Sequence, residues 1–390
     1  MTGALLAVLR GLAAMLLLML AARAQAAAPN ALRFTTAEGL PSNAVHQGVE
    51  DRVGYLWFAT DDGLARFDGH RFRIWRVEQG LADNQLLSIA TDTQDRLWIG
   101  TAQGHLMRMS ADRTGIEHFG ATRFPLLANA AIGVVLPSPD GAVWFGTRDA
   151  GLFRLGPGQR LRQFLPSARG DGLPDRRVDH LALTTDGTLW VGTPRGLARW
   201  RDGRFVAVPS MLADAPVSAL LVDAGGELWI GGAAGPWRWT GAGRLEPVDA
   251  STGTRPLGLS RRGGPWLGDA AQVWKRGAEP LPDVAVAPPG GADRPQFRAA
   301  LEDRHGSVWL LGRHLGVWRL PPHWQYFVPL EQAPGATAAA GNVLLEAGRP
   351  ATVLACADGS RWRLDADAIE HHPAGGAMPQ RWRWNAIDRP

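Results

Sequence analysis

The sequence contains almost no cysteine and almost no lysine. Cys356 is its one cysteine, which excludes an intrachain disulfide and a zinc site built from cysteines. Lys275 is its one lysine, so the basic residues are almost all arginine, spread along the chain without a basic block. The formal net charge is only +4. This distribution argues against a protein that binds nucleic acid.

Long apolar runs are also missing after the N-terminal segment. The run Leu12–Ala22 follows Arg10 and precedes Ala24-Gln25-Ala26, which has the small-residue spacing of a signal peptide cleavage site. It is too short for a comfortable membrane span. We expect residues 1–26 to be a cleaved signal peptide, with an uncleaved inner-membrane anchor as the alternative. The mature chain is then expected in the periplasm, with no transmembrane segment of its own.

Motifs of catalysis are missing as well. The sequence has no H-E-x-x-H, P-loop, G-x-S-x-G or EF-hand pattern. We therefore expect no cofactor, no metal and no catalytic residues, and we expect that the protein is not an enzyme.

Tryptophan is in excess, with 17 Trp residues against 2 Tyr. Short apolar segments carry a Trp at their second position, and the first of them reads Leu56-Trp57-Phe58-Ala59-Thr60. These Trp residues are spaced by about 37 to 46 positions, which is the period of a propeller blade. The seven units are centred on Trp57, Trp98, Trp144, Trp190, Trp229, Trp266 and Trp309.

Each unit has the same order of turns and strands. A turn such as Asp186-Gly187 precedes the Trp strand, and a second turn ends in a glycine such as Gly63. One apolar strand precedes the first turn and two strands follow the Trp strand, which makes four strands per unit. Stacked in a ring, such units bury a Trp between neighbours. We predict an all-β fold, a seven-bladed β-propeller over residues 27–330.

The ends of the repeat region predict how the ring closes. Residues 34–40 resemble residues 75–81, which leave the outer part of the first unit. We expect residues 34–40 to belong to an outer strand that completes the last blade from the other end of the chain. Residues 331–390 look like a decayed repeat without its Trp, so they are expected to be an eighth blade or the start of a second propeller.

The first units also resemble a known family. The segments Gly39–Val45 and Tyr55–Gly69 are similar to the two-component regulator propeller repeat, and the resemblance runs from about residue 32 to 320. It implies a periplasmic sensor, which in that family precedes a Tyr-rich β-sandwich, a membrane helix and a histidine kinase or diguanylate cyclase. The sequence shows no signature of those later parts. The resemblance therefore implies a truncated member or a chain that works beside a separate membrane-bound signalling protein.

Positions that differ between the units on one face of a propeller are free to bind a ligand. These positions lie in the turn after the Trp strand and in the loop before the next inner strand. They are mixed in charge and suit a polar small molecule or a glycan, because Arg side chains hold carboxylates in two-pronged fashion. The candidate ligand-binding residues are Asn43, His46, Asp61, Asp62, Asn84, Gln85, Arg148, Asp149, Arg176, Arg177, His180, Arg195, Arg313 and His314.

Three functions follow from this interpretation. The first is a periplasmic ligand-binding sensor that serves a two-component or cyclic-di-GMP signalling system without an effector domain of its own. The second is a propeller lyase or hydrolase acting on a polar exported substrate, with His46 or His180 as its acid or base. The third is a platform for protein interaction.

Overall fold

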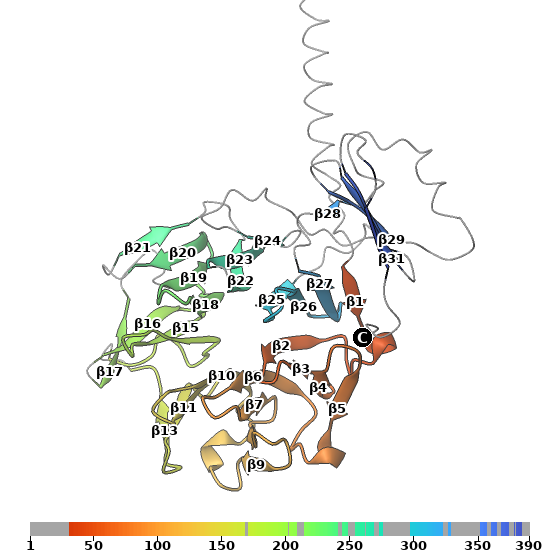
Figure 1. Cartoon of the computed structure of the whole chain (residues 1–390). Coiled ribbons are helices and arrows are strands. Elements are labelled where there is room, and N and C mark those ends of the chain that lie inside the picture. Colours follow the sequence, from red (N-terminus) through yellow and green to blue (C-terminus); the bar gives the residue numbers. More distant parts are fainter. Residues whose placement is uncertain are drawn as a thin grey trace, which may run out of the picture. The chain divides into compact units, whose positions relative to one another are not determined.

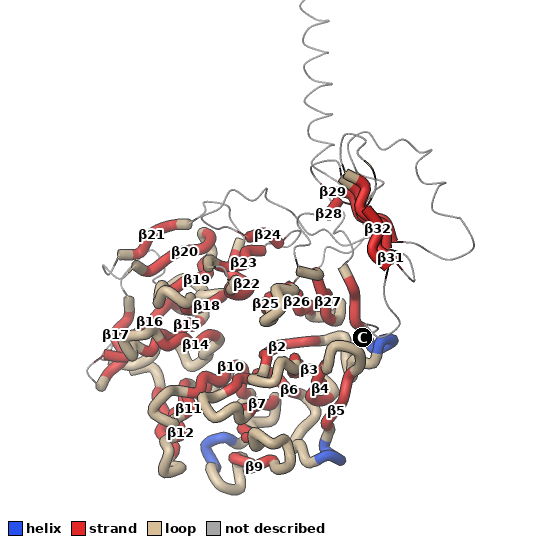
Figure 2. Tube along the Cα trace, in the orientation of Figure 1, coloured by secondary structure: helices blue, strands red, loops and turns tan. Residues whose placement is uncertain are grey.

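The computed structural model describes residues 31–167, 171–201, 203–208, 214–240, 244–248, 254–261, 263–268, 273–275, 297–322, 327–328, 352–356, 360–364, 368–373, 378 and 380–383. One compact unit contains Leu32–Arg319 and a second contains Leu320–Pro390. The predicted signal peptide lies outside the described residues. No helix in the described part of the chain is long and apolar enough to cross a membrane. In the residues described, strands account for nearly all the regular structure, beside three short 3-10 helices; the helices are blue in Figure 2.

The first unit contains six four-stranded antiparallel sheets, each a propeller blade. Five of them use consecutive strands (Figure 1). These are β2 (Val45–Glu50), β3 (Leu56–Thr60), β4 (Gly63–Phe67) and β5 (Phe72–Trp75); β6 (Leu86–Thr91), β7 (Leu97–Thr101), β8 (Leu106–Met109) and β9 (Ile116–Phe119); β10 (Ile132–Pro137), β11 (Val143–Thr147), β12 (Leu152–Leu155) and β13 (Leu161–Phe164); β14 (His180–Leu183), β15 (Leu189–Thr193), β16 (Gly196–Arg201) and β17 (Arg204–Ala207); and β18 (Ala219–Val222), β19 (Leu228–Gly232), β20 (Gly235–Trp239) and β21 (Leu245–Pro247).

The sixth four-stranded blade joins the two ends of the repeat region. Its strands run in the order β1 (Leu32–Phe34), β27 (Val317–Leu320), β26 (Val308–Gly312) and β25 (Phe297–Glu302). Phe34 pairs with Val317, and its ring stacks on Trp309 at 5.7 Å between centroids. This confirms the predicted closure by an outer strand from the start of the chain. The resemblance between residues 34–40 and 75–81 is also explained, because the 3-10 helices η1 (Thr36–Glu38) and η2 (Val77–Gln79) follow these outer strands in the same way.

A three-stranded sheet accompanies the six blades. It consists of β22 (Arg255–Leu259), β23 (Pro265–Gly268) and β24 (Val273–Lys275), and it carries Trp266. Strand β22 contacts β18 on one side and β25 on the other. The first strands of the remaining blades contact one another in chain order, from β2 through β6, β10 and β14 to β18, and β25 contacts β2. The described residues therefore show six complete blades, and the count of seven stays a prediction.

The Trp side chains hold neighbouring blades together, as expected. Trp57 is fully buried and packs with Ile89 and Leu97 of the following blade, and Trp144 packs in the same way with Val191. The glycine that follows two positions after most Trp residues makes this contact close. A Cβ atom at Gly146 would lie 2.5 Å from Cγ1 of Val178, which lies two residues before strand β14 of the next blade.

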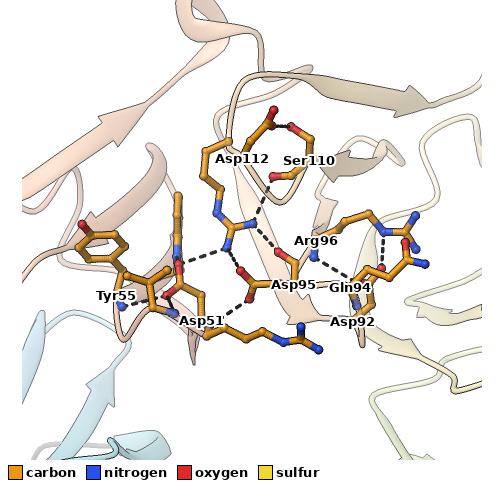
Figure 3. A network of polar contacts seen from close by, with 12 residues as sticks. Asp51, Tyr55, Asp92, Gln94, Asp95, Arg96, Ser110 and Asp112 are labelled. Carbon is orange, nitrogen blue, oxygen red and sulfur yellow. Dashed lines mark hydrogen bonds and ion pairs between the residues drawn. The ribbon is translucent and has the colours of Figure 1, made fainter.

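The turns between blades are tied by a buried ionic cluster (Figure 3). Nη2 of Arg113 lies 3.2 Å from Oδ2 of Asp51 and 3.1 Å from Oδ2 of Asp95, and all three side chains are almost wholly shielded from water. Asp95 has a φ of 61°, in a turn where other units use glycine. Its carboxylate thus serves a contact between blades that glycine at this position could not make.

The described residues of the second unit form one antiparallel sheet. Its five strands run in chain order as β28 (Phe327–Val328), β29 (Thr352–Cys356), β30 (Arg361–Leu364), β31 (Ala368–His372) and β32 (Gln380–Arg383). Whether this sheet is an eighth blade or the start of a second propeller stays a prediction.

Candidate functional site

A cavity of about 960 Å³ lies at the centre of the propeller. Its walls are formed by the first strands of the six blades and by β22 of the three-stranded sheet. This volume falls in the range of small-molecule sites, which are commonly found in the mouths and channels of closed β folds. We therefore take this cavity as the candidate site.

One sequence position in each repeat lines the cavity. This position lies eleven residues before the central Trp, as with His46 and Trp57. The seven residues that occupy it, one from each Trp unit, are His46, Leu87, Gly133, Asp179, Ser218, Arg255 and Arg298. We call this set the channel ring.

Local backbone geometry turns these residues toward the cavity. In four blades the pairing of the first two strands shifts by one residue at the ring position, which leaves His46, Leu87, Gly133 and Arg298 as the extra residue of a β-bulge. A bulge re-aims the side chain of its extra residue. Because the bulge recurs at one register position, the ring residues of these blades face the same space.

The turns after the Trp strands supply a second set of residues. Thr147 is buried, and its Oγ1 atom donates to the carbonyl of Gly151 at 2.8 Å while accepting from the amide of Ala150 at 3.0 Å. These bonds fix the turn that carries Arg148, which lines the cavity. The corresponding position in the last blade is Arg313, which also lines it.

Arginine dominates the charge of the cavity. The side chains of Arg148, Arg298 and Arg313 form no hydrogen bond or ion pair with any residue that the structure describes. Partial burial lowers the pKa of Arg298, and repulsion from Arg313, Arg255 and Arg148 lowers it further, while the negative charge of Asp61 opposes the shift. Arg255 donates to the carbonyl of Phe297 at 2.8 Å, which leaves its charge unneutralised.

The histidines of the cavity have different environments. Nε2 of His46 lies 2.8 Å from Oδ1 of Asp61, and Nε2 of Gln85 approaches the same oxygen at 3.5 Å. His180 has no carboxylate at hydrogen-bond distance among the described residues. Burial lowers its pKa to about 4, although Asp179 opposes the shift. His180 is therefore neutral at pH 7, and it can accept a proton or a hydrogen bond.

Five of the fourteen predicted site residues line the cavity, namely His46, Arg148, Arg177, His180 and Arg313. Arg177 is paired with Asp179, with Nε 2.9 Å from Oδ1. Asp61 contacts the ring of His46, and the side-chain amide of Gln85 approaches the same oxygen of Asp61. The structure thus brings half of the predicted set together, and their role in binding stays a prediction.

Asn43 and Asn84 are occupied by the backbone. Oδ1 of Asn43 accepts from the amide of Thr36 at 2.9 Å, and Oδ1 of Asn84 accepts from the amide of Val77 at the same distance. Both bonds fix the 3-10 helices η1 and η2, so these two side chains are anchors of loops.

The other predicted residues lie outside the lining of the cavity. Asp62 pairs with Arg76 at 2.8 Å, and Arg195 lies 3.8 Å from Asp214 with both side chains exposed. The remaining three are exposed and have no side-chain hydrogen bond or ion pair with the described part of the chain. They are Asp149, Arg176 and His314.

Six further residues outside the predicted set complete the site. These are Arg255 and Arg298 together with Leu87, Gly133, Asp179 and Ser218. Most of the predicted residues lie in turns and loops, whereas these six lie within inner strands or just before them. The constant distance of eleven residues to the Trp was the signal that could have found them.

Comparison with known proteins agrees with the repeat. A family profile described as "Two component regulator propeller" matches residues 80–103. Histidine kinase P4 of Formosa agariphila is 46% identical over 43 residues, which are 11% of this chain and 3% of that protein. The chain carries the two-component regulator propeller repeat. In the structure this matched repeat contains the strands β6 and β7. Trp98 belongs to β7 and packs against the next blade.

Solved structures share the fold of this regulator propeller. The extracellular domain assigned to the hybrid two component system BT3049 of B. thetaiotaomicron aligns with a TM-score of 0.61 at 17% identity, covering 92% of this chain and 50% of that one. Virginiamycin B lyase from Staphylococcus aureus aligns with a TM-score of 0.57 at 11% identity, covering 74% of this chain and 97% of that one. These likenesses show the fold alone. This chain spans about half the length of the extracellular domain and a small part of the kinase.

Proposed function

We propose that the protein is an exported ligand-recognition propeller of a signalling system of the two-component or cyclic-di-GMP type. Its ligand binds in the central cavity, and the binding event reaches a membrane-bound signalling partner. The three-stranded sheet acts as a seventh blade, and the domain works in the periplasm. The observation that carries the proposal is the channel ring, in which chemically different side chains occupy one framework position, from Leu87 and Gly133 to Asp179 and Arg298.

The framework and the ring differ in what they do. The Trp positions repeat because they pack between blades, and the ring positions vary although four of the seven are carried by the same bulge. Variation at a fixed, inward-facing position is not required for packing. It provides a pocket with a definite arrangement of charge, which is the property of a recognition site.

The proposal is tested by thermal unfolding of the full exported chain against a panel of sugar acids, neutral oligosaccharides and amino acids. A ligand at a hundredfold excess over its dissociation constant stabilises the folded state by about 2.7 kcal/mol. We expect a reproducible rise of the midpoint with the ligand recovered unchanged. A sharp transition that no compound shifts would contradict a small-molecule site and favour a protein partner.

A lyase or hydrolase is the second candidate, supported by the contact between His46 and Asp61 at the cavity. A carboxylate that holds an imidazole in place is a common support for a general base. This function requires that a compound which shifts the midpoint is also consumed. It further requires that His46→Asn abolishes consumption while the midpoint shift persists.

A further inference from the structure

We infer that one side of the cavity, where two channel-ring residues lie beside an Arg of a turn, binds an oxyanion, a carboxylate, sulfate or phosphate group carried by a small molecule. This side consists of Arg255, Arg298 and Arg313, with Arg148 facing it; we call it the arginine sector. The inference rests on the proposed function, since it names the chemistry of the ligand for the same cavity.

The first observation is an excess of positive charge. Five Arg side chains line the cavity, whereas two carboxylates, those of Asp179 and Glu302, belong to its described lining, and Asp61 acts on Arg298 from outside the lining. Asp179 is already paired with Arg177, and Oε2 of Glu302 accepts from Nε1 of Trp266 at 3.1 Å. The arginine sector therefore has no protein carboxylate of its own at contact distance among the described residues.

The second observation is how closely the sheet holds these cations together. Phe297 pairs with Gly312 across β25 and β26, so Arg298 and Arg313, which follow them, emerge at the same end of one sheet. Arg255 occupies the ring position of the neighbouring sheet, whose strand β22 contacts β25.

Cations held this near one another repel. Repulsion from Arg313, Arg255 and Arg148 adds to burial in lowering the pKa of Arg298. A bound anion would remove this cost, and Arg guanidinium groups suit it because each presents paired donors to an oxyanion.

The third observation is the uncharged arc of the ring. Leu87 and Gly133 occupy consecutive ring positions on blades other than those of Arg255 and Arg298, and a Cβ atom added at Gly133 would meet no atom within 4 Å. Arg148 emerges beside Gly133 at the end of the same sheet, because Ile132 pairs with Thr147. This arc leaves room for the neutral part of the ligand. The ring thus suits a molecule whose oxyanion lies among the Arg side chains and whose uncharged body lies over Leu87 and Gly133.

The test compares Arg298→Gln and Arg313→Gln with Arg176→Gln in the full chain. Arg176 is exposed, has no side-chain partner among the described residues and lies outside the cavity lining, so it is a matched control. The probes are sodium sulfate and D-glucuronate, which distinguish a tetrahedral oxyanion from a carboxylate, with D-glucose as the neutral reference. Ionic strength is held constant with sodium chloride, because exposed charges are screened by salt.

We expect each sector variant to weaken binding of the stabilising anion by about tenfold or more, since a hydrogen bond to a charged group is worth at least that factor. We also expect Arg298→Gln to raise the unfolding midpoint of the ligand-free chain, because it removes repulsion. The control should change neither. A lower ligand-free midpoint together with unchanged anion affinity would overturn the inference.

The failure of the inference differs from that of the proposed function. If a neutral compound binds and the sector variants leave its affinity unchanged, the oxyanion site is wrong and the ligand-binding propeller stands. If no small molecule binds the wild-type chain and Arg298→Gln gives no gain of stability, both are wrong.

Discussion

Nε1 of Trp57 donates a hydrogen bond of 2.8 Å to Oδ2 of Asp51, six residues earlier. The same relation joins Trp309 to Asp303 at 2.8 Å. Oδ1 of each aspartate also accepts backbone amides of its own turn, such as those of His305 and Ser307 at 2.9 Å. One carboxylate therefore fixes the turn and satisfies the buried indole, which joins two features of the repeat that look separate in the sequence.

We predict that Asp303→Ala destabilises the propeller by about 2 to 3 kcal/mol, because it leaves a buried indole N–H and two turn amides without their acceptor. Asp149→Ala is the control, since Asp149 is exposed and has no side-chain partner in the described part of the chain. Urea denaturation monitored by Trp fluorescence measures both. Equal midpoints for the two variants would contradict this role of the aspartate.

The ionic cluster of Arg113 predicts a second stability effect. We expect Arg113→Met to cost about 3 kcal/mol, because it leaves the carboxylates of Asp51 and Asp95 shielded and unpaired. In that background Asp95→Gly should restore part of the loss, since it removes a carboxylate and suits a φ of 61°. In the wild-type chain Asp95→Gly should instead destabilise. If Asp95→Gly changed the free energy of unfolding in the same direction in the wild-type chain and in the Arg113→Met variant, the cluster would not couple the turns.

The closing strand gives a third prediction. Phe34 contacts Phe67, Phe72 and Trp309 at centroid distances of 5.1, 5.8 and 5.7 Å. Phe34→Ala should cost about 2 kcal/mol, because it removes an aromatic ring from the joint of the two chain ends. Leu32 lies in the same strand and is 54% exposed. Leu32→Ala should therefore change the free energy of unfolding by less than about 0.5 kcal/mol. Thermal unfolding of both variants compares the two sites, and similar losses would mean that Phe34 does not anchor the closure.

His180 predicts a pH dependence. Its pKa is about 4 in the folded chain against the ordinary histidine value of 6.5, so the unfolded chain binds the extra proton between these two pH values. The stability that His180 contributes is complete above pH 6.5 and is lost as the pH falls toward 4. His180→Gln should therefore lose about 3 kcal/mol less than the wild type between pH 7 and pH 4. Parallel stability curves for the two proteins would contradict this.

Much of the fold could be predicted from the sequence because the same buried Trp recurs at the same place in each repeat. Trp57 and its counterparts mark the buried strand, and the likeness of residues 34–40 to 75–81 predicted the strand that closes the ring. The number of blades is harder to predict, since the repeat around Trp266 in β22 and β23 has diverged from the others and forms a sheet of three strands.

The site was only partly predictable. Loop position suggested Arg148 and Arg313, which line the cavity, but it equally suggested Asn84, whose side chain is bound to the amide of Val77. Arg298 was missed because a regular strand would not distinguish it from its neighbours. Its exposure to the cavity depends on a one-residue bulge, and a bulge follows from how two strands pair after folding.

The central claim is that the ligand lies in the channel ring, and Gly133→Trp tests it most directly. Gly133 has no positive φ and open space around its Cβ position, so a Trp side chain can enter the cavity without backbone strain. Gly158→Trp is the control, because Gly158 is equally unobstructed, lies in an exposed turn and does not line the cavity. Binding isotherms of a compound that stabilises the wild-type chain should show the affinity abolished in Gly133→Trp and kept in Gly158→Trp. Full affinity in a folded Gly133→Trp protein would contradict the channel as the ligand site.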